Sequence, residues 1–296
     1  MRRGTKLLLV GAFVLIAAAA GLGWSDGASS ARLLHVEPSE FAPVVVFEQY
    51  GERCMNFTEI EGEGRQTCFQ LNDPDKMVFE YTRMMTSALF VKPNPESILI
   101  IGLGGATLPV ALHKILPEAR IDTVELDPAV VRVAQTYFGY EAGPRQRVFV
   151  EDGRAFIERA HREGRQYDMV MLDAFDADYI PAHLLTIEFL RHVRAILAPE
   201  GLVISNSFAQ SRMYARESAT YTAVFGKYFN LRAGIEGNRV IIASVQALPD
   251  EAALKRNAKA LAGALQPFNI DVEAALGRFR LTDGRYDEAD VLHDPR

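Results

Sequence analysis

The sequence of 296 residues lacks several features that would assign it to a particular class of protein. It has only two cysteines, and its six histidines show no metal-ligand spacing, so no metal site is expected. No internal repeat and no strongly biased segment is present, which excludes a disordered chain. Positive charge is not in excess. The formal net charge of -6 argues against nucleic acid as the main partner and is compatible with cationic ligands. What remains is a globular chain with one large domain or two small ones.

The N-terminus has the pattern of an export signal. The basic stretch MRRGTK is followed by an uncharged apolar run from Leu7 to Trp24 and by small residues up to Ala31. These flanks disfavour a buried core helix and predict that residues 1–31 are an export signal. The apolar run is also about long enough to span a bilayer, so an uncleaved membrane anchor formed by residues 7–24 stays open. Both alternatives place the rest of the chain in the periplasm or another extracytoplasmic space.

The two cysteines fit an oxidising compartment. Cys54 and Cys68 lie in two strand-like halves on either side of the turn-rich EGEG. A hairpin would bring them opposite one another, and export would allow a disulfide to form. Two unrelated free thiols are the alternative.

Two regions with different patterns of expected secondary structure follow the N-terminal segment. Residues 32–96 hold short β-like runs such as APVVVFEQY and a helical stretch, MVFEYTRMMTSALF, which predict a β-rich cap and a connecting helix. From residue 97 to the end, apolar strands alternate with amphipathic helices, the pattern of an α/β domain. The strands are SILIIG, IDTVEL, RVFVE, YDMVMLD and GLVISN. We therefore expect a doubly wound, mostly parallel sheet, which ends in an antiparallel hairpin of LRAGI and NRVIIASV.

A cluster of glycines follows the first of these strands. Gly102, Gly104 and Gly105 precede the helical pattern ATLPVALHKIL. Glycines at this point let the backbone approach a ligand, and the N-terminus of the helix faces it. The dinucleotide pattern G-x-G-x-x-G is not met, because Thr107 occupies its last glycine position. A plain tight turn is the simpler alternative.

Acidic residues end the next three strands. Glu125 ends the second strand, Asp152 follows the third and Asp173 follows the fourth. Open parallel sheets bind ligands at this edge, and an acid at the position of Glu125 can accept hydrogen bonds from ribose hydroxyls. Asp152 before Gly153 also has the pattern of a helix cap. The three carboxylates behind a glycine turn favour a nucleoside site over coincidence.

Asp173 stands apart from the other acids of its loop, LDAFDADYIP. It follows four apolar residues of a buried strand, so its carboxylate can hold a cationic amine and accept its proton. The loop also holds Asp176 and Asp178, and Asp178 is more simply interpreted as part of a solvated loop that caps the next helix. The serine-nucleophile pattern GWSDG lies at the end of the N-terminal apolar segment, outside any strand–turn–helix, and predicts nothing.

The run ILIIGLGGATLPVALHK, TVELDPAVVRVA, VFVEDGRAFI and YDMVMLDAFDADYIPAHLLTIEFLRHVRAILAPEGLVISN resembles the spermidine synthases, the polyamine aminopropyltransferases. The resemblance covers about residues 75–245, and the β-rich cap resembles that family's N-terminal domain. It implies a sheet of the S-adenosylmethionine-dependent methyltransferase type. It also implies decarboxylated S-adenosylmethionine or S-adenosylmethionine as co-substrate, no tightly bound cofactor and no metal. The partner would be a small amine such as putrescine, and a homodimer stays open as the assembly.

The resemblance also implies roles for individual residues. Glu125 would bind ribose, and Asp152 with Gly153 would bind adenine. Asp173 would deprotonate the attacking amine with assistance from Asp176. Tyr81 would contact the substrate, and the glycine turn would hold the nucleoside.

Three departures from the family pattern concern the recognition of amines. Gly105 stands where the family's GGGDG motif has an acid, and Tyr81-Thr82-Arg83 replaces a Tyr-Gln/His-Glu element. The late substrate-contacting segment contains a tyrosine in the family, whereas here it is LRAGIEGN, which has none. Aminopropyl transfer is the favoured function. Loss of the acid at position 105 also admits intact S-adenosylmethionine and hence a methyltransferase, and a non-catalytic exported binding protein is the third alternative.

Overall fold

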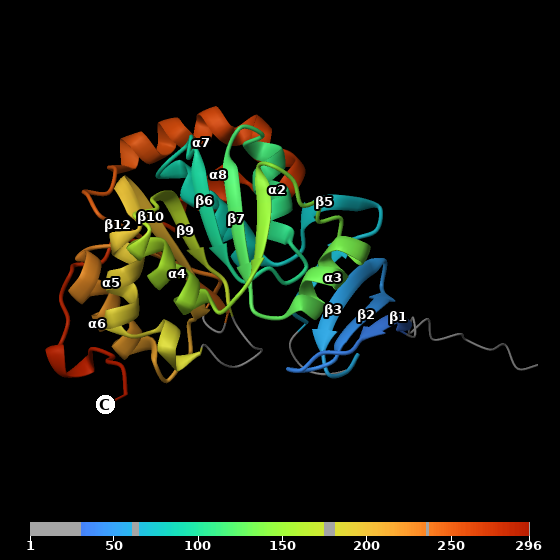
Figure 1. The fold of residues 1–296 in the computed structure, drawn as a ribbon. Coiled ribbons are helices and arrows are strands. Elements are labelled where there is room, and N and C mark those ends of the chain that lie inside the picture. The colour runs from blue at the N-terminus through green and yellow to red at the C-terminus, as the bar shows by residue number, and fades with distance from the viewer. Residues whose placement is uncertain (1–30, 61–64, 175–180, 235–236, 296) are drawn as a thin grey trace, which may run out of the picture. The chain divides into compact units, whose positions relative to one another are not determined.

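The structure is a computed structural model that describes residues 31–60, 65–174, 181–234 and 237–295. The predicted export signal therefore lies outside the described residues, apart from Ala31. The described chain contains a five-stranded sheet followed by a seven-stranded sheet with helices (Figure 1). Within these residues, no helix combines the length and the apolar character that crossing a membrane requires.

The first sheet is an antiparallel meander in strand order β1-β2-β3-β4-β5. Its strands are β1 (Arg32–Glu37), β2 (Val44–Gln49), β3 (Glu52–Phe57), β4 (Thr67–Gln70) and β5 (Asp73–Met77). Tyr50 and Gly51 form the two-residue turn between β2 and β3, with φ values of 53° and 78°. Positive φ at both positions gives the turn a twist that matches the strands beside it. The predicted β-rich cap is thus confirmed.

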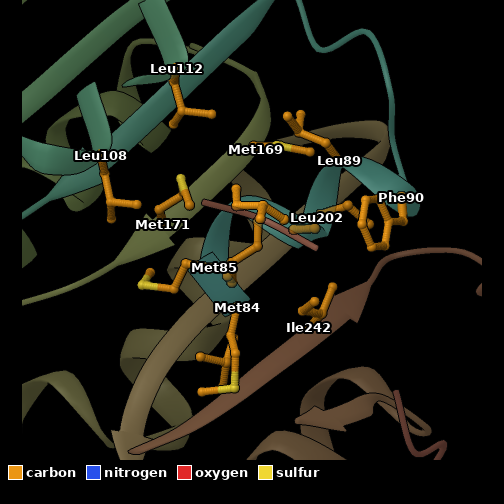
Figure 2. Close-up of a cluster of buried hydrophobic side chains, with 14 of the residues drawn as sticks. Met84, Met85, Leu89, Phe90, Leu108, Leu112, Met169, Met171, Leu202 and Ile242 are labelled. Atoms are coloured by element: carbon orange, nitrogen blue, oxygen red, sulfur yellow. The ribbon is translucent and has the colours of Figure 1, made fainter. Parts of the chain in front are cut away.

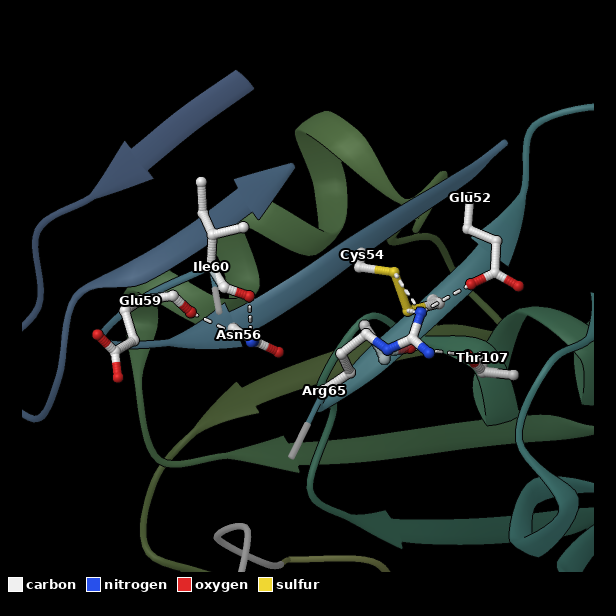
Figure 3. The surroundings of a disulfide bond; sticks show 9 residues. Glu52, Cys54, Asn56, Glu59, Ile60, Arg65 and Thr107 are labelled. Carbon is white, nitrogen blue, oxygen red and sulfur yellow. Dashed lines mark hydrogen bonds and ion pairs between the residues drawn. A yellow bond between two sulfur atoms is a disulfide. The ribbon is translucent and has the colours of Figure 1, made fainter. Parts of the chain in front are cut away.

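The cysteines pair as predicted. Cys54 on β3 lies directly opposite Cys68 on β4, and a disulfide joins them with a Cα–Cα distance of 4.1 Å (Figure 3). Arg65 lies over this bond, with Nη1 3.8 Å and 3.9 Å from the two sulfur atoms and 2.9 Å from Glu52 Oε2. The crosslink fixes the register of β4, the strand that carries Thr67.

The second sheet has the order β11-β12-β10-β9-β6-β7-β8. Its strands are β6 (Ser97–Ile101), β7 (Arg120–Glu125), β8 (Gln146–Val150), β9 (Tyr167–Leu172), β10 (Leu197–Phe208), β11 (Phe229–Arg232) and β12 (Asn238–Ser244). The pairs among β6 to β10 are parallel, whereas β12 is antiparallel to both β10 and β11. The predicted parallel sheet with a final antiparallel hairpin is confirmed.

Helices cover both faces of this sheet (Figure 1). They are α1 (Glu80–Thr86), α2 (Thr107–Ile115), α3 (Pro128–Tyr137), α4 (Gly153–Arg162), α5 (Ile187–Ala195), α6 (Tyr214–Phe225), α7 (Glu251–Leu265) and α8 (Val272–Leu276), with short 3₁₀ turns η1 (Ser87–Phe90), η2 (Ala182–Leu184), η3 (Gln266–Phe268) and η4 (Glu288–Asp290). The predicted connecting helix is shorter than expected. The stretch from Met77 becomes α1 only at Glu80, because Met77 ends β5, and α5 begins after Thr186, whose hydroxyl caps it by accepting from the Phe189 amide.

The core has two layers because the strands alternate. Ile98 and Ile100 of β6 point to one face, and Leu99 and Ile101 point to the other. Figure 2 shows the first layer, where the paired methionines of α1 pack against Met169, Met171 and aliphatic side chains of β10 and β12. A third cluster joins β2 and β3 to the glycine turn and α3, so the first sheet is packed next to the carboxyl edge of the second.

Candidate active site

A cavity of about 650 Å³ lies where the carboxyl edge of the second sheet meets the first sheet. It is lined by every predicted site residue that the structure describes. These are Tyr81, Gly102, Gly104, Gly105, Glu125, Asp152, Gly153 and Asp173. Asp176, the remaining predicted residue, lies outside the described residues. Side chains from α1 and from the carboxyl ends of three parallel strands thus converge on one site with the glycine turn, as the edge rule for parallel sheets predicted.

The glycine turn is shaped by close approach to the next strand. Gly102 has a φ of 97° and Gly104 has a φ of 50°, values that favour glycine. A Cβ at Gly102 would lie 2.3 Å from the backbone oxygen of Asp173, so a side chain there would displace the end of β9. The turn and Asp173 are therefore held against each other by the backbone itself.

Glu125 is held between the glycine turn and the start of α3. Its Oε2 accepts from the Leu103 amide at 2.9 Å, and its Oε1 accepts from the Asp127 amide at 3.0 Å. Burial raises the pKa of Glu125, and these backbone hydrogen bonds oppose the rise. Each carboxylate oxygen retains a lone pair, so Glu125 can also accept hydrogen bonds from ligand hydroxyls.

Asp152 is a helix cap, as its sequence context suggested. Its Oδ1 accepts from the Ala155 amide at 2.9 Å at the start of α4, while Oδ2 lies 3.3 Å from His183 Nε2. A Cβ at Gly153 would lie 2.5 Å from Ile101 Cγ2, so this glycine is required for the packing of α4 against β6. Asp152 and His183 both line the cavity.

Asp173 is the most perturbed acid of the cavity. Its Oδ1 accepts from Asn206 Nδ2 at 3.0 Å, and Asn206 Oδ1 in turn accepts from Asn238 Nδ2 at 3.1 Å. Burial raises the pKa of Asp173 to about 7, and the hydrogen bond from Asn206 opposes the rise. Burial and the neighbouring Asp173 raise the pKa of Tyr81 well above its ordinary value, so this phenol stays protonated and can donate. The pair can therefore offer one base and one hydrogen-bond donor.

The lining also contains polar residues that were not predicted, among them Thr67, His183, Asn206 and Asn238. Asn206 had a detectable pattern, since it ends the fifth strand pattern, GLVISN, just as the three acids follow theirs. Asn238 begins the second strand of the predicted hairpin, and His183 lies ten residues after Asp173. Thr67 has no such pattern, because it comes from the other sheet.

The departures in the amine-recognition elements have structural counterparts. A Cβ at Gly105 would lie 2.1 Å from Thr67 Cγ2 and 2.9 Å from Thr67 Oγ1, so the space beside Gly105 is occupied. Arg83 donates from Nη1 to the Met77 and Val78 carbonyls at 2.7 Å and 3.1 Å. Its guanidinium therefore holds the connection between β5 and α1.

Comparison with known proteins identifies the family. The family model described as the spermine/spermidine synthase domain matches residues 78–233. A polyamine aminopropyltransferase of Vibrio vulnificus is 44% identical over 243 residues, which are 81% of this chain and 81% of the relative. The chain belongs to the spermine/spermidine synthase family.

Structural similarity extends over both sheets. A probable spermidine synthase from Corynebacterium glutamicum superposes with a TM-score of 0.68 at 19% identity, covering 88% of this chain and 96% of that one. This likeness shows the shared fold, a methyltransferase-type sheet with an N-terminal β domain.

The eEF1A lysine and N-terminal methyltransferase of Bos taurus is 34% identical over 149 residues, but these are 45% of this chain and 21% of that protein. The similarity to the aminopropyltransferase is thus the more extensive.

Proposed function

We propose that this family member transfers an aminopropyl group from decarboxylated S-adenosylmethionine to a small amine such as putrescine. The observation that carries the proposal is Asp173, a carboxylate with a pKa near 7 at the edge of the sheet, next to the glycine turn. A carboxylate with so high a pKa is a stronger base than an ordinary aspartate and is still largely ionised above neutral pH.

The reaction needs one base and no acid. The nitrogen lone pair of the acceptor attacks the methylene carbon next to the sulfonium, forming a C–N bond. The C–S bond breaks, and its electrons stay on sulfur as the neutral thioether of methylthioadenosine. Because the leaving group is uncharged, only the amine proton has to be moved, and Asp173 accepts it. Positioning of the two substrates supplies the rest of the rate.

Charge in the cavity suits cationic substrates. The described lining residues include the carboxylates of Glu125, Asp127, Glu151, Asp152 and Asp173. Glu151 is paired with Arg159, and the cationic groups in the lining are Arg65, which is paired with Glu52, and His183 if it is protonated. An excess of negative charge favours a sulfonium donor and a protonated polyamine over anionic ligands.

Each predicted contact has a group available for it. Glu125 would accept from the ribose hydroxyls, and Asp152 with Gly153 would border the adenine. Tyr81 would donate to a lone pair near the reacting amine, since its phenol stays protonated. The glycine turn would let the backbone approach the part of the donor between the adenosine and the reacting carbon.

We also propose that the protein acts outside the cytoplasm. The basic and apolar N-terminal segment supports this, and so does the buried disulfide, because such bonds persist in oxidising compartments. Cell fractionation with an antibody to the folded part tests it, and recovery only in the cytoplasmic fraction would contradict it.

The activity is tested by the release of methylthioadenosine from decarboxylated S-adenosylmethionine with putrescine. Asp173→Asn keeps the shape of the site but cannot take a proton, so turnover should fall by about 10²- to 10⁴-fold. Asp283→Asn is the matched control, because the Asp283 side chain is 68% exposed and lies outside the cavity lining. Release of S-adenosylhomocysteine from intact S-adenosylmethionine, measured in parallel, would instead indicate methyl transfer.

A further inference from the structure

The side chain of Thr67 occupies the space that any side chain at position 105 would need. A Cβ built on Gly105 would meet Thr67 Cγ2 at 2.1 Å and the Phe138 ring at 3.0 Å. The first of these distances is far shorter than two carbon atoms allow. Thr67 is 5% exposed and comes from β4, whereas Gly105 begins the turn into α2. The two sheets therefore interlock at this point of the cavity wall.

The wall formed there is neutral and lined by hydroxyls. Thr67 Oγ1 lies 3.2 Å from Thr107 Oγ1, so each hydroxyl has the other as a partner, and both residues line the cavity. Neither side chain carries charge. The disulfide at Cys68 holds the strand beside Thr67, so the wall cannot easily move aside.

The position of this wall determines which part of a donor it meets. A nucleoside with its ribose at Glu125 and its reacting carbon near Asp173 must pass the glycine turn, which contacts Asp173 through Gly102. In this placement, the group that extends from the sulfonium along the turn would lie beside Thr67 and Thr107, which both line the cavity. A cationic amine there would meet two neutral hydroxyls.

We propose that Thr67 determines donor specificity, because it excludes a side chain at position 105. The site then recognises its donor by the adenosine and the sulfonium. The amine of the donor's aminopropyl group, the tail amine, contributes little to binding. This inference rests on the proposed function, because it assumes an adenosyl sulfonium donor in this cavity.

The test compares two sulfonium compounds that differ only in that amine. One is decarboxylated S-adenosylmethionine, and the other carries a propyl group in place of its aminopropyl group. Calorimetry of the wild type should give dissociation constants within about tenfold of each other, since an amine near neutral hydroxyls gains little. In the double variant Thr67→Ala/Gly105→Asp, a carboxylate replaces the wall, and the amine should then be preferred about 10- to 100-fold more strongly than in the wild type.

Thr67→Val is the matched control, because it removes the hydroxyl and keeps the shape. It should leave the ratio of the two dissociation constants within about threefold of the wild-type ratio. A wild-type preference of more than about 100-fold for the amine would overturn the inference, since another group would then recognise the tail. This result would leave the proposed function intact. If neither compound binds the wild type, the proposed function itself fails. Should the double variant not fold, the wild type and Thr67→Val still decide the question.

Discussion

Asn206 donates its side-chain amide hydrogen to the carboxylate of Asp173 across neighbouring strands, with Nδ2 3.0 Å from Oδ1. The two residues follow paired positions, Ser205 on β10 and Leu172 on β9. Asn238 supports Asn206 from the next strand, over 3.1 Å. Three adjacent strands thus fix the orientation of the proposed base, and the hydrogen bond lowers a pKa that burial has raised.

Asn206→Ala should shift the pH dependence of turnover. The wild type needs ionised Asp173, so kcat/KM should rise with pH through about 7. Without the hydrogen bond the pKa of Asp173 rises further, and the acid limb should move up by about one pH unit. The variant should therefore lose most activity near neutral pH and recover part of it at pH 9. Asn238→Ala should give a smaller shift in the same direction, and an unmoved limb in both variants would contradict the role.

Asp173→Asn should stabilise the protein above neutral pH although it lowers turnover. The folded-state pKa of about 7 exceeds the ordinary value of 3.8, so between these values the folded state holds a proton that the unfolded state releases. This group therefore lowers stability as pH rises from about 4 to 7. The variant lacks the effect and should gain up to about 4 kcal/mol at pH 8 and little at pH 4.5. Urea unfolding at both pH values measures it, and equal gains at both would show that ionisation is not the cause.

Glu125→Ala should weaken the binding of methylthioadenosine by about 1–3 kcal/mol, because ribose hydroxyls would lose their acceptor. Calorimetry measures the affinity. Glu125 also orders the glycine turn through the Leu103 amide, so a thermal melt must show that the variant is folded. Glu118→Ala, at an acid whose side chain is 84% exposed, is the control. Unchanged affinity in Glu125→Ala would place the ribose elsewhere.

Gly105→Ala should destabilise the fold by about 1–3 kcal/mol, because its methyl group would overlap Thr67. Adding Thr67→Ala should restore most of this loss relative to Thr67→Ala alone, as expected for two residues in direct contact. Gly143→Ala is the control, since a Cβ there meets no atom within 4 Å and the φ of Gly143 is not positive. Additive effects at positions 67 and 105 would show that the chain relaxes around the overlap.

Reduction of the disulfide should lower the free energy of unfolding. The bond joins residues separated by 14 positions, and closing a loop of this size stabilises a fold by about 3 kcal/mol. Denaturant unfolding with and without dithiothreitol measures the effect. The Cys54→Ser/Cys68→Ser variant should resemble the reduced wild type and should not respond to the reductant. A response in that variant would point to an effect unrelated to this bond.

The sequence predicted those features that depend on local pattern. The strands of the second sheet were evident from their apolar runs, and the acids at their carboxyl ends follow from the same pattern. Asn206 ends a strand pattern in the same way, but an uncharged residue at this place does not by itself indicate a site. Arg239 could not, because NRVIIASV identifies a strand without showing that the arginine is buried. Its partners Glu217 and Tyr228 come from α6 and the chain before β11, which only the tertiary structure brings together.

Thr67 illustrates the limit of such inference for the site itself. The pattern of the two cysteines predicts which strands are neighbours, but not which other element packs against the face of β4 that carries Thr67. That depends on the packing of Val44, Val46 and Met55 against α3 and the glycine turn, a contact between sequence segments far apart. The pattern of side chains within one strand carries no information about this contact.

The matched family domain begins at residue 78, so Thr67 and Gly105 lie on opposite sides of that boundary. Exchange of the N-terminal sheet between relatives would separate the two halves of this contact. A chimera that combines threonine at position 67 with a residue larger than glycine at position 105 would contain a steric overlap of the two side chains. A chimera that combines alanine at position 67 with glycine at position 105 would contain a cavity. The two positions are therefore expected to change together during divergence, and the N-terminal sheet would be inherited as part of the active site.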